Sequence, residues 1–164
     1  MTTDIQEMVT IQAADLYEEL LHERLPFILD VRNPQDVERW RVEGKQSLQS
    51  LNIPYYDFIE DEDGAAQQVP HDKPVLVVCA KAGSSEYVAD VLRSRGIEAS
   101  YLEGGLTTWG DYYDTRDIIN EPFGRIVQIT RPARGDISFI AISNGQAAII
   151  DPLRHIEHYT QVVA

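Results

Sequence analysis

V-L-V-V-C-A-K-A-G-S-S, residues 75–85, is the stretch from which the architecture of this chain can be read. Four apolar residues run into Cys79, the single cysteine, and a loop of small residues leads on to a helical pattern that begins at Ser84. The order predicts a buried strand, a tight loop and a helix start. The free N–H groups and the dipole of a helix start favour negative charge, which suits a thiolate. We expect Cys79 to be a nucleophile.

Short apolar runs alternate with helical patterns around this stretch. We expect helices over residues 10–24, 34–44, 84–95 and 106–113, and strands over residues 27–31, 51–54, 75–78 and 97–102. Residues 61–73 are acidic and contain proline, which predicts a surface loop. Strands that alternate with helices predict an α/β domain with a mostly parallel central sheet flanked by helices.

The composition changes near Glu121, which predicts a first domain over residues 1–120 and a separate segment over residues 121–164. From residue 121 onward four acids balance four bases, so the whole net charge of −13 falls on the first 120 residues. Asn144-Gly145 between two apolar runs predicts a C-terminal β-hairpin, followed by the beginning of a helix over residues 155–163. A lone hairpin buries no core of its own, so it should pack on the first domain, self-associate or be mobile.

Composition argues against several classes of partner. With 27 acids against 14 bases, nucleic acid is not an expected partner, because phosphate binding needs a basic face. No run approaches the roughly 20 apolar residues of a membrane span, and Met1–Thr10 does not resemble a signal peptide. A single cysteine excludes an intrachain disulfide and a multi-cysteine metal site. We therefore expect a cytoplasmic protein that needs no cofactor.

The loop after Cys79 is small enough for its N–H groups to curl around one sulfur atom and form an anion-binding nest. The candidate substrate-binding residues are Ala80, Lys81, Ala82, Gly83, Ser84 and Ser85. Cysteine phosphatases need C-x5-R, and Ser85 stands where that arginine would be, so the pattern favours sulfur transfer over phosphoryl transfer. The alternative is that Cys79 is a small buried hydrophobic residue of the strand.

The chain resembles the rhodanese family of sulfurtransferases in five motifs that lie in the family's order. They are L-D-V-R (29–32), E-x-W-R-V-E-G (38–44), L-N-I-P (51–54), V-V-C-A-K-A-G-S-S (77–85) and L-E-G-G-L-x-x-W (102–109). The resemblance implies that Cys79 takes sulfane sulfur from a donor such as thiosulfate and passes it to a thiol or cyanide. Because this sequence has no second cysteine, an external thiol must discharge the persulfide.

The resemblance also assigns two supporting residues and marks two departures. Asp30 and Arg32 match an Asp-x-Arg pair that props the active-site loop from the neighbouring strand. Ser84 or Ser85 stands where many members carry arginine, and residues 45–50 replace the usual H-I-P-G-A. A catalytic sulfurtransferase and a non-catalytic module for interaction or redox sensing are both open, and the reactivity of Cys79 discriminates between them.

Residues 126–140 and 144–152 resemble the first strands of a metallo-β-lactamase fold, as found in fusions of a rhodanese domain with a persulfide-oxidising enzyme. The resemblance implies a downstream domain of that type as a partner, with self-association through the tail as the alternative. The H-x-H-x-D-H metal motif is not among these residues, and we interpret His155 and His158 as surface residues of a helix. No metal site is expected.

Overall fold

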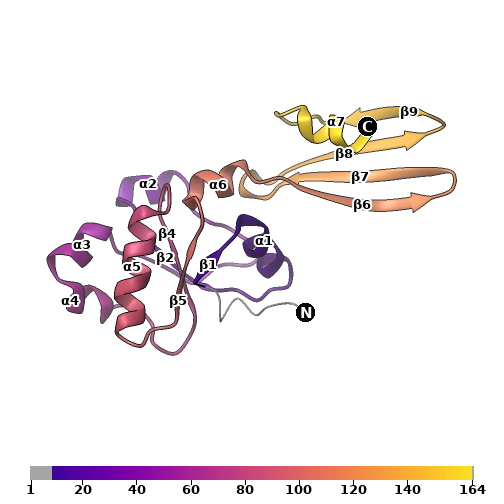
Figure 1. Cartoon of the computed structure of the whole chain (residues 1–164). Coiled ribbons are helices and arrows are strands. Elements are labelled where there is room, and N and C mark those ends of the chain that lie inside the picture. The colour runs from indigo at the N-terminus through magenta and orange to yellow at the C-terminus, as the bar shows by residue number, and fades with distance from the viewer. Residues whose placement is uncertain (1–8, 164) are drawn as a thin grey trace. The chain divides into compact units, whose positions relative to one another are not determined.

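The computed structural model describes residues 9–163, and the chain forms two compact units that divide between Trp109 and Gly110 (Figure 1). The second unit therefore begins earlier than the boundary predicted at Glu121. The reason is the strand β6 (Asp114–Glu121), which pairs with β7 (Gly124–Arg131). Its polar sequence, D-T-R-D-I-I-N-E, carries no regular apolar alternation, so the pattern did not predict a strand there.

The first unit is an α/β domain with a parallel sheet, as predicted. Its strands are β1 (Thr10–Ile11), β2 (Phe27–Asp30), β3 (Ser50–Asn52), β4 (Val75–Val78) and β5 (Ala99–Leu102), in the order β1-β5-β4-β2-β3, and all four pairings are parallel. Its helices are α1 (Ala13–Leu21), α2 (Pro34–Arg39), α3 (Tyr55–Glu60), α4 (Glu62–Ala66), α5 (Gly83–Ser94) and the first part of α6 (Gly105–Asp111), within which the division between the units falls.

The strand β4 is central in the sheet and buried on both faces, which explains its unbroken apolar run. Val75 and Val77 pack in one cluster with residues of α3, α4 and α5. Leu76 and Val78, which point to the other face, are also buried. A strand fixed on both faces gives the residue that follows it a defined position.

Three predicted elements differ in the structure. Thr10 and Ile11 form β1, paired with Tyr101 and Leu102, so the first helix begins only at Ala13. The second helix ends at Arg39 because Trp40 adopts an extended backbone, and it does not continue to Gly44. Within the predicted loop over residues 61–73 lies α4, whose start is capped by Asp61 and whose alanines are buried.

The second unit is a four-stranded antiparallel sheet rather than a hairpin alone. The strands β6, β7, β8 (Asp136–Ser143) and β9 (Gln146–Ile150) lie in sequence order, a short 3-10 helix η2 (Pro132–Arg134) joins β7 to β8, and α7 (Glu157–Val163) follows. The turn between β8 and β9 is confirmed, with positive φ angles of 50° at Asn144 and 72° at Gly145.

This unit has a small core of its own, contrary to the expectation for a lone hairpin. Val127, Ile129 and Ile140 are fully buried and pack against Tyr159 of α7. Two extra elements, β6 and α7, supply this burial. Among residues 9–163 no helix is long and apolar enough to cross a membrane.

Candidate active site

Cys79 follows the last residue of β4 directly and lies at the carboxyl end of the parallel sheet, where α/β folds bind their ligands. The residue is 5% exposed. Four residues later α5 begins at Gly83, so the loop that joins strand to helix is short. The structure thus places the single thiol at the point that the sequence predicted.

Two polar groups lie within hydrogen-bond distance of the sulfur atom. The Ala82 N–H donates to Cys79 Sγ at 3.0 Å, and Ser85 Oγ lies 3.2 Å from the same atom. The Ser85 side chain is fully buried, and its hydroxyl donates to the Ala82 carbonyl at 2.8 Å. Since a serine has one hydroxyl proton, the neutral Cys79 thiol donates to Ser85 Oγ in this arrangement.

The same contacts can serve an ionised sulfur. When Cys79 is a thiolate, Ser85 can turn its proton from the Ala82 carbonyl to the sulfur, which then accepts two hydrogen bonds. The carbonyl does not lose its last donor, because the Glu86 N–H also donates to it at 2.9 Å. The loop therefore accommodates a negative sulfur without leaving a polar group unsatisfied.

Ala82 has a backbone conformation that L-residues rarely adopt, with φ of 86° and ψ of −33°. Its N–H donates to the sulfur, and its unusual φ and ψ set the direction in which the chain leaves the loop and enters α5. A non-glycine residue in such a sparsely populated conformation costs about 1–3 kcal/mol. The rest of the fold stabilises this strained loop, as is common at functional sites.

Helix α6 holds the outer side of the loop. The Leu106 N–H donates to the Cys79 carbonyl at 2.9 Å, while the N–H and the hydroxyl of Thr107 donate to the Ala80 carbonyl at 3.1 and 2.9 Å. In a trans peptide the N–H points opposite to the carbonyl of the same unit. The N–H groups of Ala80 and Lys81 are therefore directed away from α6.

Gly105 makes this approach possible. It has φ of 63°, and a Cβ there would lie 2.6 Å from the Cys79 carbonyl oxygen and 2.7 Å from backbone atoms of Ala80 and Lys81. No side chain fits in that space. Sequence reasoning did not assign a role to Gly105 or Thr107, although the Gly-Gly pair after a predicted strand was the signal available.

Asp30 and Arg32 form a buried ion pair at the end of β2. The guanidinium Nε of Arg32 donates to Asp30 at 3.0 Å, its terminal nitrogen donates to the same carboxylate at 2.6 Å, and that nitrogen also reaches the Trp40 carbonyl at 2.6 Å. Between the two residues, the Val31 N–H donates to the Val78 carbonyl at 2.9 Å. The pair thus fixes the strand end beside β4 and the chain after α2.

The remaining predicted site residues lie in the same loop or at the start of α5. Ala80, Lys81 and Gly83 are exposed, and Ser84 is half-buried. Lys81 provides the positive charge at the mouth of the loop. The structure therefore brings all six predicted substrate-binding residues into one strand–loop–helix turn around Cys79.

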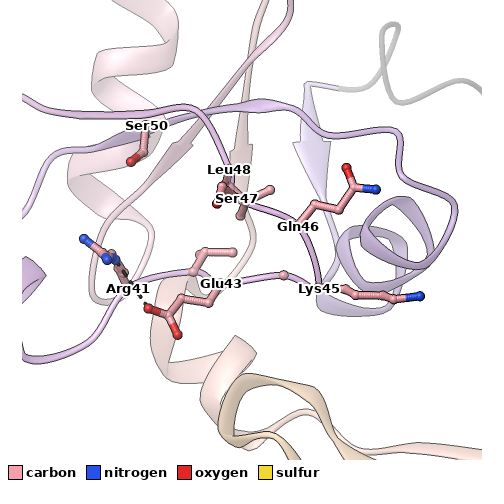
Figure 2. Close-up of a pocket in the computed structure, with 9 residues that line it drawn as sticks. Arg41, Glu43, Lys45, Gln46, Ser47, Leu48 and Ser50 are labelled. Carbon is pink, nitrogen blue, oxygen red and sulfur yellow. Dashed lines mark ion pairs between the residues drawn. The ribbon is translucent and has the colours of Figure 1, made fainter.

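A separate hollow of about 320 Å³ lies along residues 41–50, with an ion pair of 3.4 Å between Arg41 and Glu43 on its wall (Figure 2). None of the residues that line this hollow belongs to the loop around Cys79.

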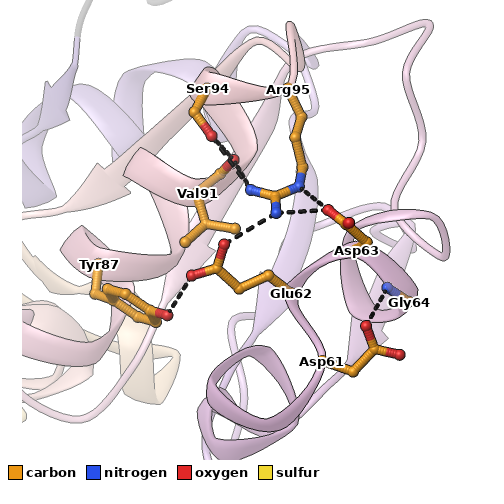
Figure 3. Close-up of polar contacts among 8 residues, drawn as sticks. All are labelled: Asp61, Glu62, Asp63, Gly64, Tyr87, Val91, Ser94 and Arg95. Atoms are coloured by element: carbon orange, nitrogen blue, oxygen red, sulfur yellow. Dashed lines mark hydrogen bonds and ion pairs between the residues drawn. The ribbon is translucent and has the colours of Figure 1, made fainter.

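A polar cluster ties α4 to α5 (Figure 3). The Tyr87 hydroxyl donates to Glu62 at 2.9 Å, and Arg95 donates to Glu62 at 2.9 Å and to Asp63 at 2.6 Å. The hydrogen bond from Tyr87, followed by that from Arg95, lowers the pKa of Glu62. The cluster braces the helix whose first turn surrounds Cys79.

The histidines that we interpreted as helix-surface residues contact Tyr113. His158 stacks on its ring at a centroid distance of 4.2 Å, and His155 meets it edge-on at 5.8 Å. Burial raises the pKa of Tyr113. Within residues 9–163 no three histidine, cysteine or acidic side chains gather in a group that could hold a metal ion.

Fold and site together define a parallel α/β domain that holds one thiol at the end of its central strand, beside the Ala82 N–H and the Ser85 hydroxyl. The family model of the rhodanese-like domain matches residues 13–112. The match spans more than half of the chain, and the chain belongs to this family. It ends close to the boundary between the two units.

Relatives and solved structures agree with this membership. The thiosulfate sulfurtransferase GlpE of Pseudoalteromonas translucida is 29% identical over 99 residues, which are 60% of this chain and 86% of that protein. The protein of the same name from Pseudomonas fluorescens is 31% identical over 103 residues, or 62% and 86% of the two chains. The crystal structure of a rhodanese-related protein from Thermoplasma volcanium matches with a TM-score of 0.50 at 28% identity, covering 62% of this chain and 90% of its own.

Proposed function

We propose that this protein is a sulfurtransferase in which Cys79 carries sulfur as a persulfide. The observation that supports the proposal most directly is the pair of polar groups at the sulfur, the Ala82 N–H at 3.0 Å and the Ser85 hydroxyl at 3.2 Å, both of which can donate to a thiolate. The names of the relatives, thiosulfate sulfurtransferase, support the same class of reaction at about 30% identity.

In the first half-reaction the Cys79 thiolate attacks the sulfane sulfur of thiosulfate. A Cys79–sulfur bond forms, the sulfur–sulfur bond of the donor breaks, and sulfite leaves with the bonding electron pair. A persulfide donor reacts in the same way and releases a thiolate. Lys81 favours the approach of either anion. The N–H groups of Ala80 and Lys81 are directed away from α6, and we expect them to donate to an added sulfur.

In the second half-reaction an acceptor attacks the outer sulfur of the persulfide. Cyanide becomes thiocyanate, or an external thiolate becomes a new persulfide, and the Cys79 thiolate leaves with the electron pair. The Ala82 N–H and the Ser85 hydroxyl stabilise that leaving group as its charge returns. The sequence has no second cysteine to take the sulfur internally.

Mass spectrometry of the intact protein after incubation with thiosulfate, or with glutathione persulfide, tests the proposal. We expect one added sulfur atom that cyanide removes as thiocyanate, and no addition in Cys79→Ser. A protein without this adduct contradicts it. In that case, alkylation of Cys79 at neutral pH separates a redox sensor, whose thiol reacts, from an inert interaction module.

The likeness of the tail to a metallo-β-lactamase fold stays a prediction, because the family match ends at residue 112. We therefore propose sulfur transfer as a function of the first unit alone.

A further inference from the structure

The second unit exposes an apolar face on the side of its sheet away from the small core. Val127, Ile129 and Ile140 point to the side where Tyr159 packs, so the alternate residues of the strands point to the other side. On that side, four residues, one from each strand, are directly paired across the sheet and form a row. The row is Ile119, Ile126, Ala141 and Ala148.

The row forms the floor of a hollow of about 460 Å³. Gly124, Ala141 and Ala148 leave space above the sheet because their side chains are small or absent. Beside it stands Phe123, which is 76% exposed in the turn between β6 and β7. The same patch thus carries a protruding aromatic ring and a hollow with an apolar lining.

The charges of the chain favour contact at this face. Residues 110–164 hold seven acids and five bases, a net charge of −2, so the remaining −11 falls on residues 1–109. Arg125 is the one charged residue that lines the hollow, and its guanidinium pairs with Asp117 at 2.6 Å. At the rim, β9 reads Q-A-A-I-I without a charge, although edge strands are usually guarded by charges.

We propose that this face binds the same face of a second copy of the chain. The patch carries both a protruding ring and a hollow, so it can be complementary to itself. Two copies related by a twofold axis can then each place their Phe123 ring in the hollow of the other. Two strongly acidic first units repel each other, whereas two nearly neutral second units meet without that repulsion. An exposed apolar patch of this kind marks an association surface.

Sedimentation velocity of the full chain over a range of concentrations tests the proposal. The wild type forms a dimer as the concentration rises. Phe123→Asp places a carboxylate in the apolar hollow, and Ala148→Arg fills the floor of the hollow with a charged side chain. Each substitution weakens dimerisation at least about tenfold, because an unpaired buried charge is costly. Both positions are exposed, so the fold tolerates the changes, and far-UV circular dichroism verifies it.

Ile156→Asp is the matched control. Ile156 is 71% exposed but lies in the segment before α7, so its replacement leaves dimerisation unchanged. A wild type that stays monomeric at every concentration overturns the proposal. A dimer that persists in both Phe123→Asp and Ala148→Arg also overturns it. The same holds if Ile156→Asp weakens the dimer as strongly as those two substitutions do.

Discussion

Ser85 has one hydroxyl proton and two acceptors within reach, the Ala82 carbonyl at 2.8 Å and the Cys79 sulfur at 3.2 Å. A phosphatase-type loop would place an arginine at this position, and a fixed positive charge would bind a large anion there. A hydroxyl can instead donate to a thiolate and accept from a thiol. The residue therefore suits a sulfur that alternates between charged and neutral states.

Replacement of Ser85 by alanine should slow persulfide formation about 10- to 100-fold, because a hydrogen bond to a charged group contributes roughly 1.5–3 kcal/mol. Single-turnover mass spectrometry with thiosulfate measures the rate. Ser94→Ala is the control, since Ser94 lies at the far end of the same helix and its hydroxyl donates to the Val91 carbonyl. Equal rates in the two variants would show that Ser85 does not assist the sulfur.

At the scale of elements, two helices determine the shape of the loop from outside it. The first turn of α6 binds the Cys79 and Ala80 carbonyls, and α4 braces α5 through Glu62. Neither contact touches the sulfur. Both fix the backbone that surrounds it.

Thr107→Val removes one of the two hydrogen bonds that α6 gives to the Ala80 carbonyl. We expect persulfide formation to slow by about 2- to 10-fold, from a loss of roughly 0.5–1.5 kcal/mol. Alkylation of Cys79 by iodoacetamide should be unchanged, because the peptide unit that Thr107 binds carries the Lys81 N–H, which is not among the groups bonded to the Cys79 sulfur and which we expect to donate to an added sulfur. Thr108→Val, one residue further along α6, should alter neither rate, and a loss shared by both variants would refute a specific role for Thr107.

Tyr87→Phe removes the hydrogen bond that contributes most to the lowered pKa of Glu62. A carboxyl group with a lowered pKa in the folded state stabilises the fold above its unfolded pKa of 4.5, and this contribution disappears as the pH falls through the folded value. The variant should therefore have a lower urea midpoint than the wild type at pH 7, and the difference should shrink as the pH falls below 4.5 and through the folded pKa of Glu62. Tyr56→Phe on α3 controls for the loss of a phenol, and a difference that grows as the pH falls would contradict the linkage.

At the scale of the whole molecule, each of the two units buries hydrophobic residues of its own. Both tryptophans, Trp40 and Trp109, belong to the first unit, and Tyr159 is the buried aromatic residue of the second. Tryptophan fluorescence therefore reports the first unit, while far-UV circular dichroism reports both. The two signals need not follow one transition.

Tyr159→Ala should destabilise the second unit by about 3–5 kcal/mol, the usual cost of removing a buried aromatic side chain. In urea, the circular dichroism should lose part of its amplitude at a lower midpoint, while the fluorescence transition stays in place. Persulfide formation at Cys79 should be unaffected. A shift of the fluorescence midpoint by the same amount would mean that the two units unfold together.

The parallel sheet and the position of Cys79 were predictable because β4 and α5 carry strong local patterns, an unbroken apolar run and a helical face. The contacts of Gly105 and Thr107 with the loop were not, since they join residues about 25 positions apart in the chain and depend on backbone geometry rather than on residue type. β6 escaped prediction for another reason. It is an exposed edge strand, and its polar sequence is determined by solvent rather than by a core.

The Ala82 carbonyl offers a spectroscopic readout of the charge on the neighbouring sulfur. It accepts two hydrogen bonds, from the Ser85 hydroxyl and the Glu86 N–H, while Cys79 is neutral. When the hydroxyl turns to the thiolate, the carbonyl keeps only the second, and its stretching vibration moves to higher frequency. In protein labelled with carbon-13 at alanine carbonyls, difference infrared spectra across the ionisation of Cys79 should contain this band, and Ser85→Ala should abolish it.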